Sequence, residues 1–181
     1  MTKLFLIRHC QANGQEPEAQ LTAEGQEQAE KLALFLDKYR INRIFSSPFE
    51  RAIQTIAPFA HKQNLKIEVD ERLKERILSS EHLSDWLEKL KRSFEDEDLK
   101  FTGGESSKEA TERIVSFIKE ISKMQTDHVA IVTHGNLSAL LLNYLSQDFG
   151  FDKWLSISNP DIYLLENHSE KFTYKRIWDA N

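Results

Sequence analysis

The sequence predicts an α/β fold, a three-layer αβα sandwich around a mostly parallel central sheet. Two short apolar runs, residues 4–7 and 129–132, are typical of strands that are buried on both faces, as in a parallel sheet covered by helices. Up to residue 69 the expected elements alternate strand, helix, strand, helix, strand. This order favours parallel pairing with right-handed crossovers.

Length and composition fit one folded domain. The 181 residues provide enough chain for a sizeable core, and 40% of them are hydrophobic. The formal net charge of −5 gives no support to a general nucleic-acid surface, so any anionic ligand must be held by a local cluster of cations. The single cysteine excludes an internal disulfide.

The hydropathy pattern gives no sign of a membrane protein. No apolar run approaches the roughly twenty residues that a membrane span needs. The first apolar run, residues 4–7, is shorter than the apolar region of a signal peptide. We therefore expect a protein of the reducing cytoplasm, with neither membrane nor nucleic acid among its partners.

The first half of the chain is expected to supply two helices between three strands. A polar loop over 11–20 precedes an amphipathic helix over 22–39, which has Thr22 at its N-cap. Further strands are expected at 41–45 and 65–69.

The second of these helices should begin directly after the strand at 41–45. Pro48 fits the first turn of a helix, with Ser47 as its cap. Apolar residues at helical spacing continue this helix to Phe59.

Residues 77–100 break the alternation and form a helical excursion. An apolar stripe at helical spacing predicts one helix over 80–95, with charged residues on its other faces. This helix is a candidate lid, but a plain packing helix is the favoured interpretation because such stripes usually face the core. Gly103 and Gly104 end the excursion.

The remaining chain is expected to return to alternating elements and to end in edge strands. We find no internal repeat and no low-complexity linker, so a single domain is expected over residues 1–181. The expected elements are a helix over 105–123, a strand over 128–133, a helix over 137–145 and edge strands at 154–157, 162–165 and 172–178.

Side chains suited to phosphate chemistry follow the expected strands. They are Arg8 and His9 after the first strand, Arg51 near the start of a helix, Glu75 past the third strand and His134 after a later one. Ligands of open α/β sheets bind at the carboxyl ends of strands, so these groups are expected to share one site.

The residue types in this set favour metal-free phosphoryl transfer. Arginine binds phosphate oxygens bidentately and stays charged. A neutral imidazole can attack phosphorus and carry the phosphoryl group as a covalent intermediate. A carboxylic acid can protonate the leaving alkoxide and later activate water. Positioning and charge neutralisation are what this reaction needs.

Two other chemistries are less favoured. His9 and His134 could be ligands of a metal, but no carboxylate lies at the usual short spacing from either. A Ser-His-Asp hydrolase would need a Gly-x-Ser-x-Gly turn, which the sequence lacks. A lone histidine at a strand end is often structural, whereas two in matching contexts indicate a site. No metal and no cofactor are expected.

Six motifs follow one another in a specific order. They are Leu6-Ile7-Arg8-His9, Leu21-Thr22-x-x-Gly25-x-x-Gln28-Ala29, Ser46-Ser47-Pro48-x-x-Arg51-Ala52-x-Gln54-Thr55, Arg72-Leu73-Lys74-Glu75, Gly103-Gly104-Glu105-Ser106 and Val132-Thr133-His134-Gly135. In combination they resemble the histidine phosphatase superfamily, in its phosphoglycerate mutase-like branch. The resemblance extends from residue 4 to about residue 165, nearly the whole chain.

The resemblance implies a phosphoglycerate mutase-like fold and a role for each matching residue. His9 would be the nucleophile that becomes phosphohistidine. Arg8, Arg51 and His134 would form the phosphate pocket with it. Glu75 would be the proton donor and acceptor.

Several positions after the nucleophile depart from the family pattern. Cys10 replaces a glycine, Ala12 stands where the family often has threonine, and Gln15 stands where it often has asparagine. Asn13 is a candidate to replace that last contact, so Asn13 and Gln15 are both candidates for substrate binding. Cys10 is expected to have an ordinary backbone and to act as a small buried filler, with a redox-sensitive thiol as the less favoured interpretation.

The expected function is cofactor-independent hydrolysis of a small soluble phosphomonoester through phospho-His9.

A phosphoglycerate mutase-type phosphotransfer ranks second, because the chain is shorter than the family's mutases and the 77–100 excursion is too small for their substrate-enclosing insertion. A phosphohistidine-protein phosphatase is disfavoured by Glu75, because a phosphoramidate needs less acid help. A non-catalytic binding module is disfavoured because every catalytic residue is present. The identity of the substrate and the oligomeric state stay open.

Overall fold

The computed structural model describes residues 3–124, 128–168 and 171–179. The strands of this part are β1 (Lys3–Arg8), β2 (Arg43–Ser46), β3 (Ile67–Val69), β4 (His128–Thr133), β5 (Asp161–His168) and β6 (Lys171–Arg176). Its helices are α1 (Ala23–Leu36), α2 (Glu50–Gln63), α3 (Trp86–Glu95), α4 (Ser107–Ile121), α5 (Gly135–Ser146) and α6 (Phe151–Leu155), with one 3-10 turn, η1 (Glu71–Leu73).

The strands form one mixed, mostly parallel sheet in the order β3-β2-β4-β1-β5-β6. The pairs β3–β2, β2–β4 and β4–β1 are parallel, whereas β5 pairs antiparallel with both β1 and β6. The expected α/β fold is confirmed. Strands also occur at the two expected positions after residue 160, but of these only β6 is an edge strand, because β5 lies between β1 and β6.

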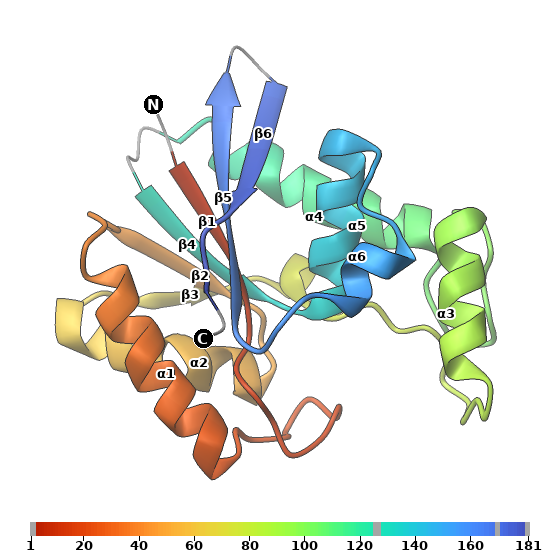
Figure 1. The fold of residues 1–181 in the computed structure, drawn as a ribbon, viewed down its shortest axis with the longest axis horizontal. Helices are drawn as coiled ribbons and strands as arrows, with labels where there is room; N and C mark the ends of the chain where they lie inside the picture. The colour runs from red at the N-terminus through yellow and green to blue at the C-terminus, as the bar shows by residue number, and fades with distance from the viewer. Residues whose placement is uncertain (1–2, 125–127, 169–170, 180–181) are drawn as a thin grey trace.

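Helices cover both faces of the sheet, with α1 and α2 on one side and α4 and α5 on the other (Figure 1). Alternate side chains of a strand point to opposite faces. Phe5 and Ile7 of β1 therefore pack with α1 and α2, whereas Leu4 and Leu6 pack with α4 and α5. All four are fully buried. The unbroken apolar runs of β1 and β4 thus have the two-faced burial that the sequence predicted.

The segment expected as an edge strand at 154–157 is instead the end of helix α6. Trp154 donates its backbone N–H to the carbonyl of Gly150, 3.0 Å away. Its ring packs against that of Phe151, with 5.5 Å between centroids. The two aromatic residues are three apart, which places them on one helical face. The prediction failed because a five-residue helix carries too little periodicity to be told from a strand.

The predicted cap of the second helix is also wrong. Helix α2 begins at Glu50, and Phe49 at its N-cap makes no capping side-chain bond. The Ser47 hydroxyl accepts from the Phe49 N–H at 3.2 Å and lies 2.8 Å from Nε2 of His134. Ser47 therefore closes a turn before the helix and contacts a histidine, which no local pattern would indicate.

Helix α3 is the helical part of the expected excursion and begins at Trp86, six residues later than the expected helix over 80–95. It lies at the edge of the molecule away from the sheet (Figure 1). Leu90 and Ser93 are buried, whereas Trp86 is 50% exposed and Leu87 is 43% exposed. The apolar stripe is thus only partly covered. The role of α3 as a lid stays a prediction.

Helix α4 begins with a capping box. The Ser106 hydroxyl accepts from the Glu109 N–H at 3.1 Å, and the Glu109 carboxylate accepts from the Ser106 N–H at 2.8 Å. Two backbone N–H groups that would otherwise lack a partner at the start of the helix are satisfied in this way. In the part of the chain that the structure describes, no helix has the length and apolar content of a membrane span.

Replacing Ser106 by alanine should lower the free energy of unfolding by about 1 kcal/mol, because one orphan N–H loses its acceptor. Ser116→Ala is the control: Ser116 lies exposed in the middle of the same helix and should change stability by about 0.5 kcal/mol or less. Urea denaturation of the three proteins measures both values. Equal effects of the two substitutions would contradict the assigned cap.

Candidate active site

The centre of the candidate site is the end of the parallel pair β1 and β4. Arg8 lies opposite Thr133 in this pair, and the His9 N–H donates to the Thr133 carbonyl at 3.0 Å. His9 and His134 follow the two strands directly. Their rings are 5.1 Å apart between centroids and inclined by 64°. The structure therefore brings the two strand-end histidines together.

His9 is held as a neutral imidazole. Its Nδ1 lies 2.7 Å from the carbonyl oxygen of Cys10, and Nε of Arg51 donates to its Nε2 at 3.2 Å. These contacts assign the proton to Nδ1 and leave a lone pair on Nε2. Burial lowers the pKa of His9 to about 3, and the charges of Arg51 and Arg8 act in the same direction. An unprotonated Nε2 is what nucleophilic attack requires.

Arg51 fixes one side of the site from the first turn of α2. Only 1% of the residue is exposed. Its Nη1 donates to the carbonyls of Gln15 and Glu16 at 3.1 and 2.8 Å, and its guanidinium lies 4.9 Å from the ring centroid of Phe49. Burial lowers its pKa. Arg51 thus ties the loop after β1 to His9.

Arg8 approaches from the end of β1. Its Nη1 donates to the Ile157 carbonyl at 2.7 Å, whereas its buried Nε has no hydrogen-bond partner among the described residues. A side chain at Gly135 would lie 3.0 Å from Cζ of Arg8. The glycine therefore lets the start of α5 pack directly on the guanidinium. Nε of Arg8 therefore keeps an unused donor.

His134 is the second buried ring. Its Nε2 lies 2.8 Å from the Ser47 hydroxyl, and its Nδ1 has no partner in the described part of the chain. Ser47 already accepts from Phe49, so it can donate to Nε2 and leave the proton on Nδ1. Burial holds the pKa of His134 well below its usual value, and the nearby His9 lowers it further. A neutral His134 can donate from Nδ1 to a phosphate oxygen.

Glu75 sits at the N-terminus of α5. Its two carboxylate oxygens accept from the backbone N–H groups of Asn136 and Leu137 at 3.1 and 3.0 Å, and the N–H of Arg76 adds a third bond at 2.8 Å. Helix N-termini favour negative charge. The carboxylate is thus fixed by backbone groups of a helix that follows His134 directly.

A pocket of about 590 Å³ opens beside these groups. Arg8 and Glu75 line it together with Gly135. Residues that the sequence did not single out complete the lining. They are Arg76, Leu78, Trp86, Leu90, Asn136 and Trp154, from α3, α5, α6 and the segment after Glu75. Trp86 and Leu90 belong to the stripe that the sequence offered as a candidate lid, whereas the other four lie in ordinary stretches of sequence and meet at the pocket only in the folded chain.

The two predicted substrate contacts after β1 differ in position. Gln15 lines the pocket. Asn13 does not, and its side-chain amide donates to the Leu21 carbonyl at 3.4 Å. A role for Asn13 in substrate binding stays a prediction.

Cys10 is a buried filler, as predicted. It is fully buried and has no positive φ. Burial raises the pKa of its thiol to about 12. A thiol with this pKa is protonated and weakly reactive at neutral pH.

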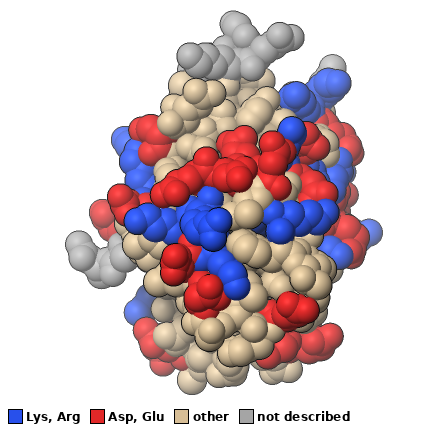
Figure 2. All heavy atoms as spheres, turned by 90° about the vertical axis from the view of Figure 1, so that its right-hand side faces the viewer, with Lys and Arg blue, Asp and Glu red and all other residues tan. Residues whose placement is uncertain are grey.

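The molecular surface beside the site has mixed charge. On the face that carries α3, Lys and Arg side chains alternate with Asp and Glu (Figure 2). This face therefore offers no broad basic patch. Within the described ranges, no group of three or more His, Cys, Asp and Glu residues is arranged to hold a metal ion.

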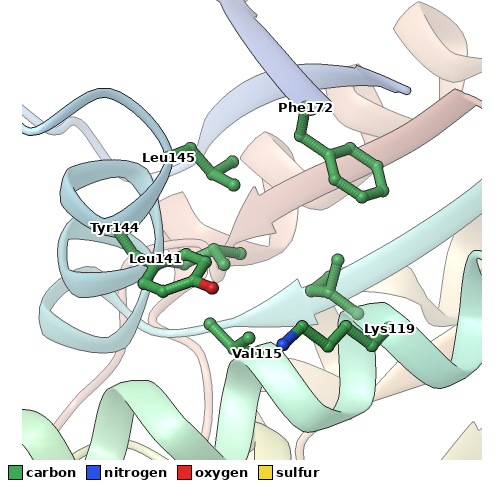
Figure 3. Close-up of a pocket in the computed structure, with 7 residues that line it drawn as sticks. Val115, Lys119, Leu141, Tyr144, Leu145 and Phe172 are labelled. Carbon is green, nitrogen blue, oxygen red and sulfur yellow. The ribbon is translucent and has the colours of Figure 1, made fainter. Parts of the chain in front are cut away.

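A smaller pocket of about 230 Å³ lies between α4, α5 and β6 (Figure 3). Its lining is largely apolar and includes Val115, Leu141 and Phe172, with Lys119 and Tyr144 at its edge. None of the phosphate-directed side chains reaches it, so it carries no comparable chemistry.

Comparison with known proteins supports the resemblance identified from the sequence. The model of the histidine phosphatase superfamily (branch 1) matches residues 4–180. Phosphoserine phosphatase 1 of Hydrogenobacter thermophilus is 28% identical, over 74% of this chain and 71% of that protein. The predicted family is confirmed.

Solved structures share the fold. The mycobacterial glucosyl-3-phosphoglycerate phosphatase in complex with inorganic phosphate superposes with a TM-score of 0.80 and 25% identity, over 99% of this chain and 98% of that chain. The Bacillus stearothermophilus protein YhfR gives a TM-score of 0.81 at 21% identity, over 100% and 98% of the two chains. The predicted phosphoglycerate mutase-like fold is confirmed.

The neutral state of His9 predicts a pH-dependent stability. Between its folded pKa of about 3 and its ordinary value of 6.5, the unfolded chain binds more protons than the folded one. The free energy of unfolding should therefore fall as the pH drops from 6.5 towards 3, by about 1.4 kcal/mol per pH unit for each such histidine. His9→Asn should reduce this dependence of the unfolding free energy on pH, whereas the same change at the exposed His61 should not. Denaturant titrations between pH 4 and 8 measure it, and an unchanged slope in His9→Asn would disprove the assignment.

Proposed function

The chain belongs to the histidine phosphatase superfamily, branch 1, and on this basis we propose that it is a cofactor-independent phosphatase acting on a small phosphomonoester. The reaction proceeds through a phosphohistidine intermediate on His9. The proposal rests on one observation. Nε2 of His9 has a lone pair that accepts from Nε of Arg51, and Arg8 and the ring of His134 lie near it.

In the first step, Nε2 of His9 gives up its hydrogen bond from Nε of Arg51 and attacks the phosphorus atom, and the ester P–O bond breaks. Nε of Arg8, the Arg51 guanidinium and Nδ1–H of His134 bind the phosphoryl oxygens and stabilise their developing charge. Protonated Glu75 gives its proton to the leaving alkoxide, so the alcohol departs neutral. The products are phospho-His9, the alcohol and an ionised Glu75.

In the second step, the Glu75 carboxylate removes a proton from a water molecule. The water oxygen attacks phosphorus, the P–N bond breaks and inorganic phosphate is released. His9 returns to its neutral state, and Glu75 is protonated again for the next cycle.

Transfer to water is favoured over transfer to a second substrate position. The proteins compared with this chain include a phosphoserine phosphatase and a glucosyl-3-phosphoglycerate phosphatase. The pocket beside Glu75 has lining residues from α3, α5 and α6, and Trp86 in its lining is half exposed. A pocket of this kind admits water, whereas a mutase must exclude it.

His9→Ala should abolish hydrolysis of 4-nitrophenyl phosphate, because no nucleophile remains. The wild type should be active with a chelator present, and a phosphoryl label trapped on it in alkali should be lost in acid. His61→Ala, at an exposed histidine of α2, should behave as the wild type. Activity that disappears on chelation, or that survives in His9→Ala, would contradict the mechanism.

Glu75→Gln should slow hydrolysis to an extent that depends on how much the leaving group needs a proton. An alkyl phosphate needs protonation of its alkoxide, so its kcat should fall by about a hundredfold or more. The reaction of 4-nitrophenyl phosphate should fall much less in the first step, because nitrophenolate leaves without a proton. Single-turnover rates of the two esters separate these effects. Glu71→Gln, at an exposed carboxylate paired with Lys74, is the control. An equal loss for both esters would argue against an acid role.

A further inference from the structure

One loop, residues 156–161, contacts both site residues at the end of β1. It connects α6 with β5 and passes the end of β1, because β5 pairs antiparallel with β1 (Figure 1). The Ile157 carbonyl accepts from Nη1 of Arg8 at 2.7 Å. Nδ2 of Asn159 donates to the His9 carbonyl at 2.8 Å. The 156–161 loop therefore holds a phosphate-directed arginine and the histidine beside it.

The peptide group that follows His9 is held on both sides. Its carbonyl accepts from Asn159, and its N–H, which belongs to Cys10, donates to the Thr55 hydroxyl at 2.8 Å. The next carbonyl, that of Cys10, lies 2.7 Å from Nδ1 of His9 and fixes the tautomer of the ring. A rotation of the peptide group would carry this carbonyl away from Nδ1. The bond from Asn159 therefore bears on the direction of Nε2.

Asn159 acts from outside the pocket. The side chain is half-buried and does not line the pocket beside Glu75. Its bond is to a backbone carbonyl of His9. Any effect of Asn159 on the reaction therefore passes through His9, as expected of a group that supports a functional side chain from behind.

A buried ion pair anchors the 156–161 loop. Asp161 is fully buried. Nε of Arg176, from β6, donates to its Oδ1 at 2.9 Å, and Nη2 lies 2.7 Å from its Oδ2. Oδ2 also accepts from the Ser158 N–H at 3.0 Å, while Nη2 of Arg176 donates to the Ser156 carbonyl at 3.4 Å. The pair thus fixes the loop at both of its ends.

The same carboxylate faces Arg8 across the sheet. Asp161 lies opposite Arg8 in the pairing of β5 with β1. Burial lowers the pKa of Arg8, and the negative charges of Glu75 and Asp161 oppose this effect. Removing one partner of a buried ion pair leaves the other charge uncompensated. Without Arg176, the carboxylate would attract the Arg8 guanidinium away from the Ile157 carbonyl.

We propose that Asn159 and Arg176 are positioning residues of the active site. Asn159 fixes the direction of the His9 ring. Arg176 acts through Asp161 and fixes the guanidinium of Arg8. This inference rests on the proposed function, in which His9 forms the bond to phosphorus and Arg8 binds the phosphoryl oxygens. Loss of Asn159 should therefore lower kcat, whereas loss of Arg176 should weaken the binding of phosphate.

Asn159→Ala should lower kcat for 4-nitrophenyl phosphate about tenfold to a hundredfold, because the nucleophile loses its alignment. The Kd of inorganic phosphate, measured by calorimetry, should stay close to the wild-type value. Asn159→Asp keeps the shape of the side chain but cannot donate, so its kcat should fall as well. Asn143→Ala is the matched control, because this half-buried amide also holds a backbone group, the Phe149 N–H at 3.1 Å, and does not line the pocket. Its kcat should equal that of the wild type.

Arg176→Met should raise the Kd of inorganic phosphate about tenfold, as expected for the loss of one charge-assisted hydrogen bond. Lys175→Met is the control, because it removes a positive charge from the neighbouring exposed position of β6. Its Kd should equal that of the wild type. Arg176→Lys keeps the charge but cannot reach Asp161 and Ser156 together, so its Kd should be intermediate. This variant decides the matter where Arg176→Met does not fold.

The proposal is overturned by a wild-type kcat in Asn159→Ala, by an equal loss of kcat in Asn143→Ala, or by equal Kd values for Arg176→Met and Lys175→Met. Failure of the proposed function has a different signature, because the wild type would then not hydrolyse the ester. In that case the phosphate Kd still tests Arg176. Nitrogen-15 NMR of the His9 ring then tests Asn159: the Nδ1-protonated tautomer should lose population in Asn159→Ala and keep it in Asn143→Ala.

Discussion

The parallel pairing of β1 with β4 is the constraint on which the site depends. In this register Arg8 lies opposite Thr133, so His9 and His134 leave their strands at the same level and their rings meet. A shift of one residue would turn the side chains of one strand to the opposite face. Such a shift would also exchange the fully buried side chains of β1 that pack against the two helix layers, so close packing of the core secures the register. Core packing and active-site geometry therefore have one origin.

This arrangement concentrates positive charge inside a chain whose net charge is −5. Arg8 and Arg51 are desolvated, and burial lowers their pKa. The same burial keeps His9 and His134 neutral, so in the proposed mechanism the arginines supply charge while the imidazoles supply a nucleophile and a donor. A dianionic phosphate restores favourable interactions to these arginines in a site of low dielectric. In the proposed mechanism, desolvation thus serves both the binding of phosphate and the reactivity of His9.

The sequence was informative where function coincides with a regular pattern. The apolar runs located the strand ends that His9 and His134 follow. The alternation of strands and helices along the chain predicted the parallel sheet. Prediction from the sequence failed at α6, which was expected as a strand, because five residues are too few for a periodic signal. It also failed at Ser47, which was expected as a helix cap but contacts a residue 87 positions away through its hydroxyl. Arg76 and Asn136 were missed for a related reason. They line one pocket only because the segment after Glu75 and the start of α5 meet in the folded chain.

Position 10 shows why a departure from the family pattern can leave the chemistry intact. The carbonyl of Cys10 holds Nδ1 of His9, and its N–H donates to the Thr55 hydroxyl at 2.8 Å. That hydroxyl in turn donates to the Arg51 carbonyl at 2.7 Å. The nucleophile and the first turn of α2 are thus joined through backbone groups of residue 10. Because the Cys10 side chain only fills space on a backbone without positive φ, any small residue that keeps this backbone can hold His9 in the same tautomer.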